Sequence, residues 1–477
     1  MRRLTCEKTY LTAMLEFLRL GKNVQITSEY MQKSEVEFCD YSVGAKYLWR
    51  DEFVIDYAIY NDTLIMKETC EDYYTAFYYP IGKDVEGALL EIERFCKENN
   101  LPLFFCCIDN ERASELSKRY PFAKIISERD WSDYIYLADN FKTYSGKKFS
   151  GQRNHVNKFK KLYPNYKFSI YKDEDFSSVS LFIDEYVKRI EKSSLQKEEC
   201  EKLRDYLMNL TSISQVGGII KVDEKVVAIS FGERVKDTLI VHVEKGLREY
   251  QGVYPTMASE FAKAFAVDGV KFINREEDCG DMGLRISKLQ YHPIEVKEKN
   301  NVEVLTAFEK LPNEIKIKTE NLLLEELSVN DKNAYRDLYL DDELNKFWGY
   351  DYREDLGENQ PTADYFYNFN KMLRKNKEEL SLLIKKEGTV VGEVVLHEFD
   401  FYGGVEIGFR ISKEHQNKGY AFEAVSNLID YVKKTIKPIN INAKCFKENS
   451  PSEKLLIKLG FTKVSKDEKY FYFTYKG

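Results

Sequence analysis

Two hydrophobic patterns alternate along the whole chain. From Val405 to Ile411 every second residue is apolar, which is typical of a β-strand. From Ala421 to Val432 the apolar residues recur at the spacing of one helix face. The same order of hairpin, strand, turn, helix and strand occurs between Gly217 and Asn274. The sequence therefore predicts a mixed α/β fold in which one architecture is repeated.

A polar turn joins the strand ending at Ile411 to the following helix, and it contains Gln416-Asn417-Lys418-Gly419-Tyr420-Ala421. A glycine lets the backbone come close to a ligand, and the first amides of a helix have no internal partner. Such a turn is suited to bind a pyrophosphate. An ordinary strand-to-helix connection has the same spacing, so spacing alone leaves both interpretations open.

The residues around this turn narrow the choice. Gln-x-x-Gly-x-Ala after that strand, followed by Asn449-Ser450-Pro451-Ser452 and Leu459-Gly460-Phe461, resembles the acetyl-CoA signature of the GNAT acyltransferases, in the ribosomal-protein N-acetyltransferase branch. The resemblance covers about residues 319–477 and implies acetyl-CoA as cofactor and a primary amine as acceptor. It implies CoA contacts from Phe409, Ile411, Gln416, Asn417, Lys418, Gly419, Tyr420, Ala421 and Asn449.

Glu406 is the candidate for removing a proton from the amine. It faces away from the apolar Val405 and Ile407, beside Gly408, where a missing side chain would leave room for substrate. A partly desolvated carboxylate has the raised pKa that suits a base. A charged residue on the solvated face of a strand has the same pattern, so that interpretation stays open.

Ser452 is the candidate for donating to the leaving thiolate. A thiolate with a pKa of about 8.5 needs only modest help, such as one donor. Many relatives have a tyrosine where this chain has Leu456, so the resemblance leaves the serine for this role. Ser450-Pro451-Ser452-Glu453 also has the pattern of a capping box that starts a helix, and Asn449 equally fits the end of a strand.

A second signature occurs in the middle of the chain. The run from Asn274 to Lys288, followed by Tyr291-His292-Pro293, resembles the soluble relatives of the phosphatidylglycerol lysyltransferase C-terminal domain. Ser145-Gly146-Lys147-Lys148 and the run from Arg153 to Phe159 fit the same family. This resemblance covers roughly residues 1–298 and implies two GNAT-like units in tandem. Its membrane-bound members move an aminoacyl group from tRNA to a lipid.

Turn signals and composition shifts predict the domain boundaries. The stronger one lies between Lys297 and Thr319, and a softer one lies between Ala138 and Ser145. We therefore expect three GNAT-like units: 1–140 and 141–300 in a lysyltransferase-like module, and 319–477 as the N-acetyltransferase domain.

Composition limits the function classes. A chain of 477 residues with 43% hydrophobic and 32% charged residues is typical of a globular protein of several domains. The net charge of −7 gives no overall attraction to nucleic acid or membrane. Nine scattered cysteines, and no apolar stretch after the first residues, indicate reduced thiols in a cytoplasmic protein. Five dispersed histidines offer no metal-ligand pattern, so we expect no metal.

Two charged regions of the lysyltransferase-like module remain ambiguous. From Phe141 to Ile170 there are eight Lys or Arg and no Asp or Glu. Lys147, Lys148, Arg153 and Lys158 are therefore candidates for binding tRNA or another polyanion, or for the solvated face of one amphipathic helix with Phe149, Val156 and Phe159 inward. Candidates for a substrate site, or for an internal ion-pair network, are Arg275, Glu276, Asp278, Arg285 and Lys288.

The sequence thus predicts an acyltransferase that acetylates a primary amine, with an aminoacyltransferase-like module of unknown acceptor. One alternative is that this module is a non-catalytic platform that presents a nucleic acid or protein to the last domain. Another is a tRNA-dependent aminoacyltransferase whose product the last domain acetylates. The sequence does not name the acceptor.

Overall fold

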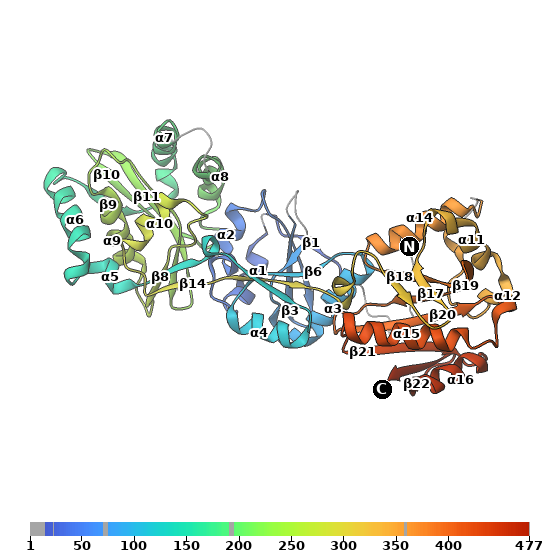
Figure 1. Ribbon diagram of the computed structural model, residues 1–477. Helices are drawn as coiled ribbons and strands as arrows, with labels where there is room; N and C mark the ends of the chain where they lie inside the picture. The colour runs from blue at the N-terminus through green and yellow to red at the C-terminus, as the bar shows by residue number, and fades with distance from the viewer. Residues whose placement is uncertain (1–14, 22, 70–74, 190–194, 357–359, 477) are drawn as a thin grey trace. The chain divides into compact units, whose positions relative to one another are not determined.

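The computed structural model describes residues 15–21, 23–69, 75–189, 195–356 and 360–476 (Figure 1). The chain divides into two compact units. The larger unit comprises Leu11–Glu115 and Ile125–Glu303, and the smaller one includes Leu116–Lys124 and Val304–Gly477. In the described part of the chain, no helix is both long enough and apolar enough to span a bilayer.

The first β-sheet has eight strands. Its strands, in spatial order, are β1 (Leu18–Arg19), β2 (Val54–Tyr60), β3 (Thr63–Thr69), β4 (Ala76–Phe77), β6 (Leu103–Ile108), β15 (Asn300–Val304) and β7 (Lys124–Ser127), while β5 (Ile81–Gly82) pairs with β3. Its helices are α1 (Gln25–Met31), α2 (Val43–Leu48), α3 (Val85–Glu98) and α4 (Asn110–Arg119).

The second sheet has seven strands. They are β14 (Glu295–Lys297), β8 (Asp133–Leu137), β13 (Phe272–Asn274), β12 (Thr238–Gly246), β11 (Lys225–Val235), β10 (Val216–Val222) and β9 (Lys167–Ile170). The helices of this region are α5 (Ala138–Thr143), α6 (Ser150–Leu162), α7 (Phe176–Val187), α8 (Leu195–Asn209), α9 (Val253–Phe265) and α10 (Met282–Leu289).

The third sheet belongs to the smaller unit and has eight strands. They are β16 (Lys316–Lys318), β17 (Leu323–Glu326), β18 (Glu379–Lys386), β19 (Thr389–His397), β20 (Gly404–Ile411), β21 (Asn440–Phe446), β23 (Tyr470–Tyr475) and β22 (Phe461–Lys466). The helices are α11 (Lys332–Leu340), α12 (Asp342–Asn345), α13 (Tyr352–Leu356), α14 (Ala363–Lys375), α15 (Tyr420–Thr435) and α16 (Ser450–Lys458).

The same architecture occurs in all three sheets. Each contains a parallel pair next to an antiparallel run: β4 with β6, β12 with β13, and β20 with β21. A helix lies between the two strands of each pair along the chain, namely α3, α9 and α15. The apolar face of α15 is buried in the core of the smaller unit, and Figure 1 shows this helix alongside β20 and β21. The predicted mixed α/β class and its repeat are confirmed.

The basic stretch differs from the expected single helix. Phe149, Val156 and Phe159 are buried as predicted, but α5 ends at a left-handed Tyr144, and α6 begins only at Ser150. Tyr144 and Gly146 both have positive φ angles, which a continuous helix does not allow. Strand β8 lies before residue 140, where the sequence predicts a domain boundary, but it pairs with strands of the second sheet. The boundary itself remains a prediction.

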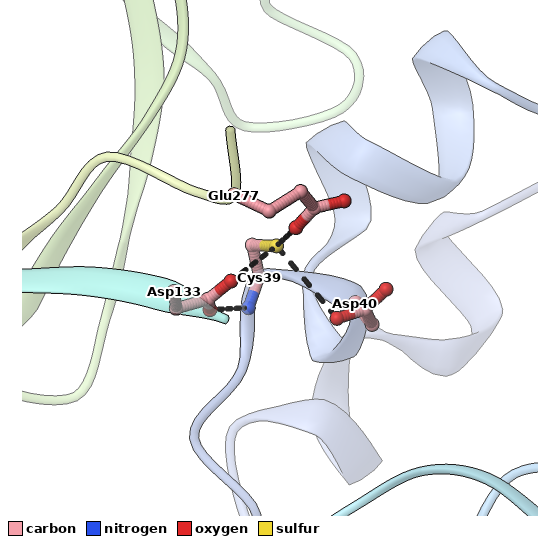
Figure 2. Close-up of side chains that lie close together, drawn as sticks. All are labelled: Cys39, Asp40, Asp133 and Glu277. Carbon is pink, nitrogen blue, oxygen red and sulfur yellow. Dashed lines mark hydrogen bonds between the residues drawn. The ribbon is translucent and has the colours of Figure 1, made fainter. Parts of the chain in front are cut away.

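A buried ammonium group links distant segments of the larger unit. The Lys299 Nζ lies 2.5 Å from Asp40, 2.8 Å from Asp133, 2.7 Å from Glu277 and 3.3 Å from the Cys39 sulfur. Figure 2 shows these four partners close together, with the consecutive Cys39 and Asp40 meeting Asp133 and Glu277 from two other segments. Their ligand atoms lie within 4.8 Å of one another, which suits a metal ion. The ammonium already contacts all four, so we assign no metal here.

A buried imidazole makes a second such link. His242 on β12 lies 3.0 Å from Glu233 through Nε2 and 2.7 Å from Glu276 through Nδ1, and the Gly44 amide of α2 also donates to Glu233. Burial alone would lower the pKa of His242, but the two carboxylates outweigh it and raise this pKa to about 9. His242 is therefore a cation at neutral pH.

This pKa predicts how stability depends on pH. The folded-state pKa lies above the ordinary value for histidine, so the stabilisation is complete below about pH 6.5 and is lost as the pH rises toward 9. We expect His242→Gln to remove at most roughly 3 kcal/mol of pH-dependent stability between these values.

Urea unfolding at several pH values, with hydrogen exchange reporting on peptides of the larger unit, measures this dependence. His155→Gln is the matched control because His155 is exposed. Equal pH dependence in the wild type and in His242→Gln would show that His242 is not the titrating cation.

Candidate functional site

The site begins where two parallel strands stop pairing. β20 and β21 pair only from Gly404 with Asn440 to Glu406 with Asn442. β20 continues to Ile411, whereas β21 from Asn442 onward pairs on its other side with β23. Within the described residues, no ladder joins 407–411 to β21. The two strands therefore diverge, and that edge of β20 has no partner among the described strands from Ile407 onward.

The predicted turn lies directly after β20 and is open. Residues 416–419 are exposed, and Asn417 and Gly419 have φ angles of 57° and 84°. Helix α15 begins at Tyr420 with no side-chain cap. A Cβ added at Gly419 would meet no atom within 4 Å. Exposed first-turn amides without a capping side chain are an anion-binding site.

Two hydrogen-bonded groups hold the turn in place. The Gln416 side chain donates to the Ile411 carbonyl at 2.9 Å, which ties the turn back to β20. Glu423 in the first turn of α15 accepts from the Thr319 hydroxyl at 2.6 Å and from the Asn321 amide at 2.7 Å. Burial raises the pKa of Glu423, but these donors outweigh it and hold the pKa low. This carboxylate is thus occupied within the protein.

The equivalent helix starts in the larger unit are closed. Helix α9 also begins after a left-handed glycine, Gly252, but a Cβ there would lie 2.2 Å from the His155 carbonyl oxygen of α6. Helix α3 has Asp84 as its N-cap, and the Asp84 carboxylate accepts from the Gly87 amide. A carboxylate cap repels phosphate. Among the described residues of the three repeats, the turn before α15 is the open one.

Glu406 lies where the strands separate and has two basic neighbours. Its side chain is 15% exposed, and its Oε1 lies 3.5 Å from the His397 Nε2 and 3.2 Å from the Lys444 Nζ. The space beside Gly408 is filled more than the sequence suggested. A Cβ at Gly408 would lie 2.7 Å from a methyl of Val395. The glycine therefore accommodates its cross-strand neighbour as well as any substrate.

Sequence reasoning missed a buried ion pair on the same strand. The alternation along β20 puts Arg410 on the same face as Glu406, but Arg410 is 4% exposed and donates to Glu393 through Nε and Nη2 at 2.9 and 2.6 Å. Its guanidinium also contacts Asn345 and lies over the rings of Tyr339 and Trp348. Glu393 and Arg410 are directly cross-strand. Opposite charges at facing positions of two predicted neighbouring strands are the signal that indicates such a pair.

Asn449 and Ser452 lie together at the start of α16. The Asn449 side chain accepts from the Ser452 amide at 3.2 Å, so Asn449 is the N-cap. The expected cap, Ser450, is instead the first helical residue, and Pro451 follows it. An asparagine cap satisfies a first-turn amide as well as a serine does. The Ser452 hydroxyl is partly exposed and is not required for the cap.

In the larger unit, Arg275 pairs with Glu244 at 2.8 Å, and both side chains are nearly buried. The Arg275 Nη1 has no hydrogen-bond partner in the described part of the chain. The adjoining cavity, lined by Phe141 and Ile273 among others, measures about 10 Å³. A cavity of this size holds about one water molecule, so it admits no small-molecule substrate as it stands.

The other candidates in this cluster have protein partners. Asp278 is fully buried and accepts from Arg285 and from the Tyr134 hydroxyl. The Lys288 ammonium donates to the backbone carbonyls of residues 275–277. Glu276 pairs with His242. Of the two interpretations left open by the sequence, these contacts favour the internal network.

The candidate residues for polyanion binding differ in their exposure and contacts. Lys147, Lys148 and Lys158 are exposed. Arg153 instead donates to the carbonyls of Tyr144 and Gly146, so it holds the turn before α6. The exposed surface of this region is therefore basic, but Arg153 is part of its framework.

Comparisons with known proteins agree with the division of the chain into a larger and a smaller unit. Residues 33–299 match the family described as "Phosphatidylglycerol lysyltransferase, C-terminal". Residues 321–462 match the "Acetyltransferase (GNAT) domain".

Similar proteins are known for both parts. The uncharacterized N-acetyltransferase p20 of Bacillus licheniformis is 30% identical over 30% of this chain and 81% of its own length. The uncharacterized N-acetyltransferase YjdG of Bacillus subtilis is 30% identical over 34% of this chain and 95% of its own. A conserved protein of unknown function from Bacteroides thetaiotaomicron has a solved structure with a TM-score of 0.58, 27% identity, and coverage of 61% of this chain and 99% of its own.

The contrast between the open and closed helix starts is testable with matched substitutions. Gly419→Ala and Gly252→Ala both place a side chain at a left-handed position, which costs roughly 1–2 kcal/mol. At residue 252 the new Cβ also meets the His155 carbonyl, so we expect a further loss of roughly 1–3 kcal/mol. Urea unfolding with hydrogen exchange resolved by unit measures both losses. Equal losses would mean that α6 does not close the turn before α9.

Proposed function

Because this chain belongs to the phosphatidylglycerol lysyltransferase C-terminal family and also contains a GNAT acetyltransferase domain, we propose that its smaller unit transfers an acetyl group from acetyl-CoA to a primary amine. That the chain is an acyltransferase follows from the GNAT match and its N-acetyltransferase relatives. The choice of acetyl-CoA and of the amine is the proposal.

The observation that carries this proposal is the open turn before α15, at the end of diverging strands. We assign the exposed amides of this turn and Lys418 to the CoA pyrophosphate, because they supply donors and positive charge. The open edge of β20 near Phe409 and Ile411 suits the amides of the pantetheine arm. Bound acetyl-CoA supplies an activated thioester.

We assign the proton transfer to Glu406 and Ser452. Glu406 holds the acceptor ammonium by charge and takes its proton, which leaves the amine nucleophilic. The Ser452 hydroxyl donates to the leaving thiolate. The role of Ser452 requires no unusual group, because a thiolate leaves readily. Glu406 lies near His397 and Lys444, and its carboxylate supplies the negative charge that attracts an acceptor ammonium.

The experiment that tests this function uses Gly419→Asp. The aspartate puts a carboxylate where phosphate binds, while the open space at this position keeps the fold intact. We expect calorimetry to detect acetyl-CoA binding to the wild type and none to the variant. Acetylation of a panel of peptide and small-molecule amines, followed by mass spectrometry, should disappear in parallel.

Gly349→Asp is the control, since a Cβ there also meets no atom and Gly349 also has a positive φ. Undiminished acetyl-CoA affinity in Gly419→Asp would exclude this turn from the site.

For the larger unit, we propose an aminoacyltransferase-like role that uses aminoacyl-tRNA, on the basis of the family and the exposed lysines of the region that includes α6. The alternative of a non-catalytic platform predicts binding without transfer. The closed helix starts at Gly252 and Asp84 argue against a second CoA site in this unit.

The tRNA proposal predicts salt-dependent binding by the full chain. Reversing Lys147, Lys148 and Lys158 to Glu should weaken tRNA retention in a filter assay, and the log–log salt slope should decrease by about 0.9 for every phosphate that is no longer neutralised. Arg153 is left unchanged because it holds the turn. Reversing Lys434, Lys437 and Lys466 to Glu controls for the equal change in net charge, since all three are exposed. Absence of tRNA retention at low ionic strength would exclude this role.

A further inference from the structure

A primary amine of the protein itself contacts the proposed base. Lys444 follows Asn442 and Ala443 on β21, just beyond the last residue that pairs with β20. Its Nζ lies 3.2 Å from the Glu406 Oε1, and its side chain is 35% exposed. The Glu406 side chain is 15% exposed. The Lys444 ammonium therefore contacts the Glu406 carboxylate in the way that the proposed function requires of an acceptor ammonium.

Lys444 and Glu406 also lie on the same face of the third sheet. On β21, Ile441, Ala443 and Cys445 are buried in the core together with the apolar face of α15. Lys444 alternates with them and so faces away from that core, as Glu406 does on β20 between the buried Val405 and Ile407. Base and amine therefore meet on the side of the sheet opposite to α15, at the point where the strands separate.

We propose that Lys444 is a site of self-acetylation, an internal acceptor for the smaller unit. The inference rests on the proposed function and adds a modification site to it. The Glu406 carboxylate takes a proton from the Lys444 ammonium, and the neutral Nζ then attacks the thioester carbonyl carbon. A C–N bond forms, the C–S bond breaks, and the CoA thiolate takes up a proton. The net change converts ammonium and acetyl-CoA into acetyl-lysine, free CoA and one proton.

A simple ion pair that orients Glu406 would have the same distance, and two reactions of the full chain separate the possibilities. The first supplies acetyl-CoA with a deuterated acetyl group and follows each lysine by peptide mass spectrometry. We expect Lys444 to be labelled at least about tenfold faster than the exposed Lys434 and Lys437. Glu406→Gln should slow Lys444 by roughly 10²–10⁴-fold, the usual contribution of a general base. The rate should not change on dilution of the protein, because the reaction is intramolecular.

The second reaction contains no CoA and uses the N-hydroxysuccinimide ester of acetic acid, which acetylates any unprotonated amine. The Lys444 Nζ is held 3.2 Å from the Glu406 Oε1 and its side chain is only 35% exposed, so Lys444 should react more slowly than the exposed Lys434 in the wild type. Glu406→Gln removes the carboxylate charge and should make Lys444 react faster. The same substitution thus slows the reaction with acetyl-CoA and accelerates the reaction with the ester, a reversal that general reactivity of the lysine cannot produce.

Calorimetric binding of acetyl-CoA separates failure of this inference from failure of the proposed function. If acetyl-CoA binds but Lys444 is labelled no faster than Lys434, self-acetylation is wrong and the acetyltransferase function stands. If Glu406→Gln accelerates both reactions, Lys444 is chemically reactive but not enzymatically acetylated, and the inference is also overturned. If acetyl-CoA does not bind, the proposed function itself fails. Labelling that disappears in both Glu406→Gln and Gly419→Asp supports both.

Discussion

The end of the ladder between β20 and β21 is the constraint on which the candidate site depends. A strand that loses one neighbour keeps unpaired backbone groups and needs other contacts to hold it extended. For β20 those contacts come from the opposite side, where Arg410 forms a buried pair with Glu393 of β19. Removing one partner of such a pair costs about 3–5 kcal/mol, so the pair is a strong constraint on strand position. The open edge next to it is consequently preorganised.

The three repeats show that architecture alone does not decide what binds. Each has a parallel strand pair and a connecting helix, but the helix starts differ in what covers them. Gly419 is open, Gly252 is covered by the His155 carbonyl, and Asp84 caps its own helix with a carboxylate. A carbonyl or carboxylate oxygen at a helix start repels an anion, whereas open amides there attract one. The three helix starts thus differ by a few atoms in whether they are open to an anion.

The sequence predicted most of the local structure of the site. The period of two in β20 and the helical spacing in α15 depend on neighbouring residues only, so the strand, the turn and the helix lie within a few residues of their expected bounds. Alternation assigns charge to the solvent side, and this rule failed at Arg410, because a cross-strand carboxylate and two aromatic rings cover it. At α16, Asn449 and Ser450 are both good caps, and pattern alone does not rank them.

No local sequence pattern predicts the contacts of Lys299 and His242. Lys299 meets carboxylates from Asp40, Asp133 and Glu277, which are far apart in the chain. No spacing rule links such residues, and each by itself has the pattern of an exposed charge. Only the tertiary fold of the larger unit brings them together. The same limit applies to the cluster from Arg275 to Lys288, whose internal partners the sequence did not reveal.

The charges around Glu406 also constrain the acceptor. Two unit charges 4 Å apart interact by about 4 kcal/mol at an effective dielectric of 20. In the proposed reaction, an incoming ammonium would therefore compete with Lys444 for the Glu406 carboxylate, which lies 3.2 Å from the Lys444 Nζ. A strongly cationic acceptor would be repelled by Lys444 before it reached the base. An amine that carries its own carboxylate would instead gain a contact with Lys444 while delivering its nitrogen to Glu406. Charge complementarity thus favours zwitterionic or acidic amines over polycationic ones at this site.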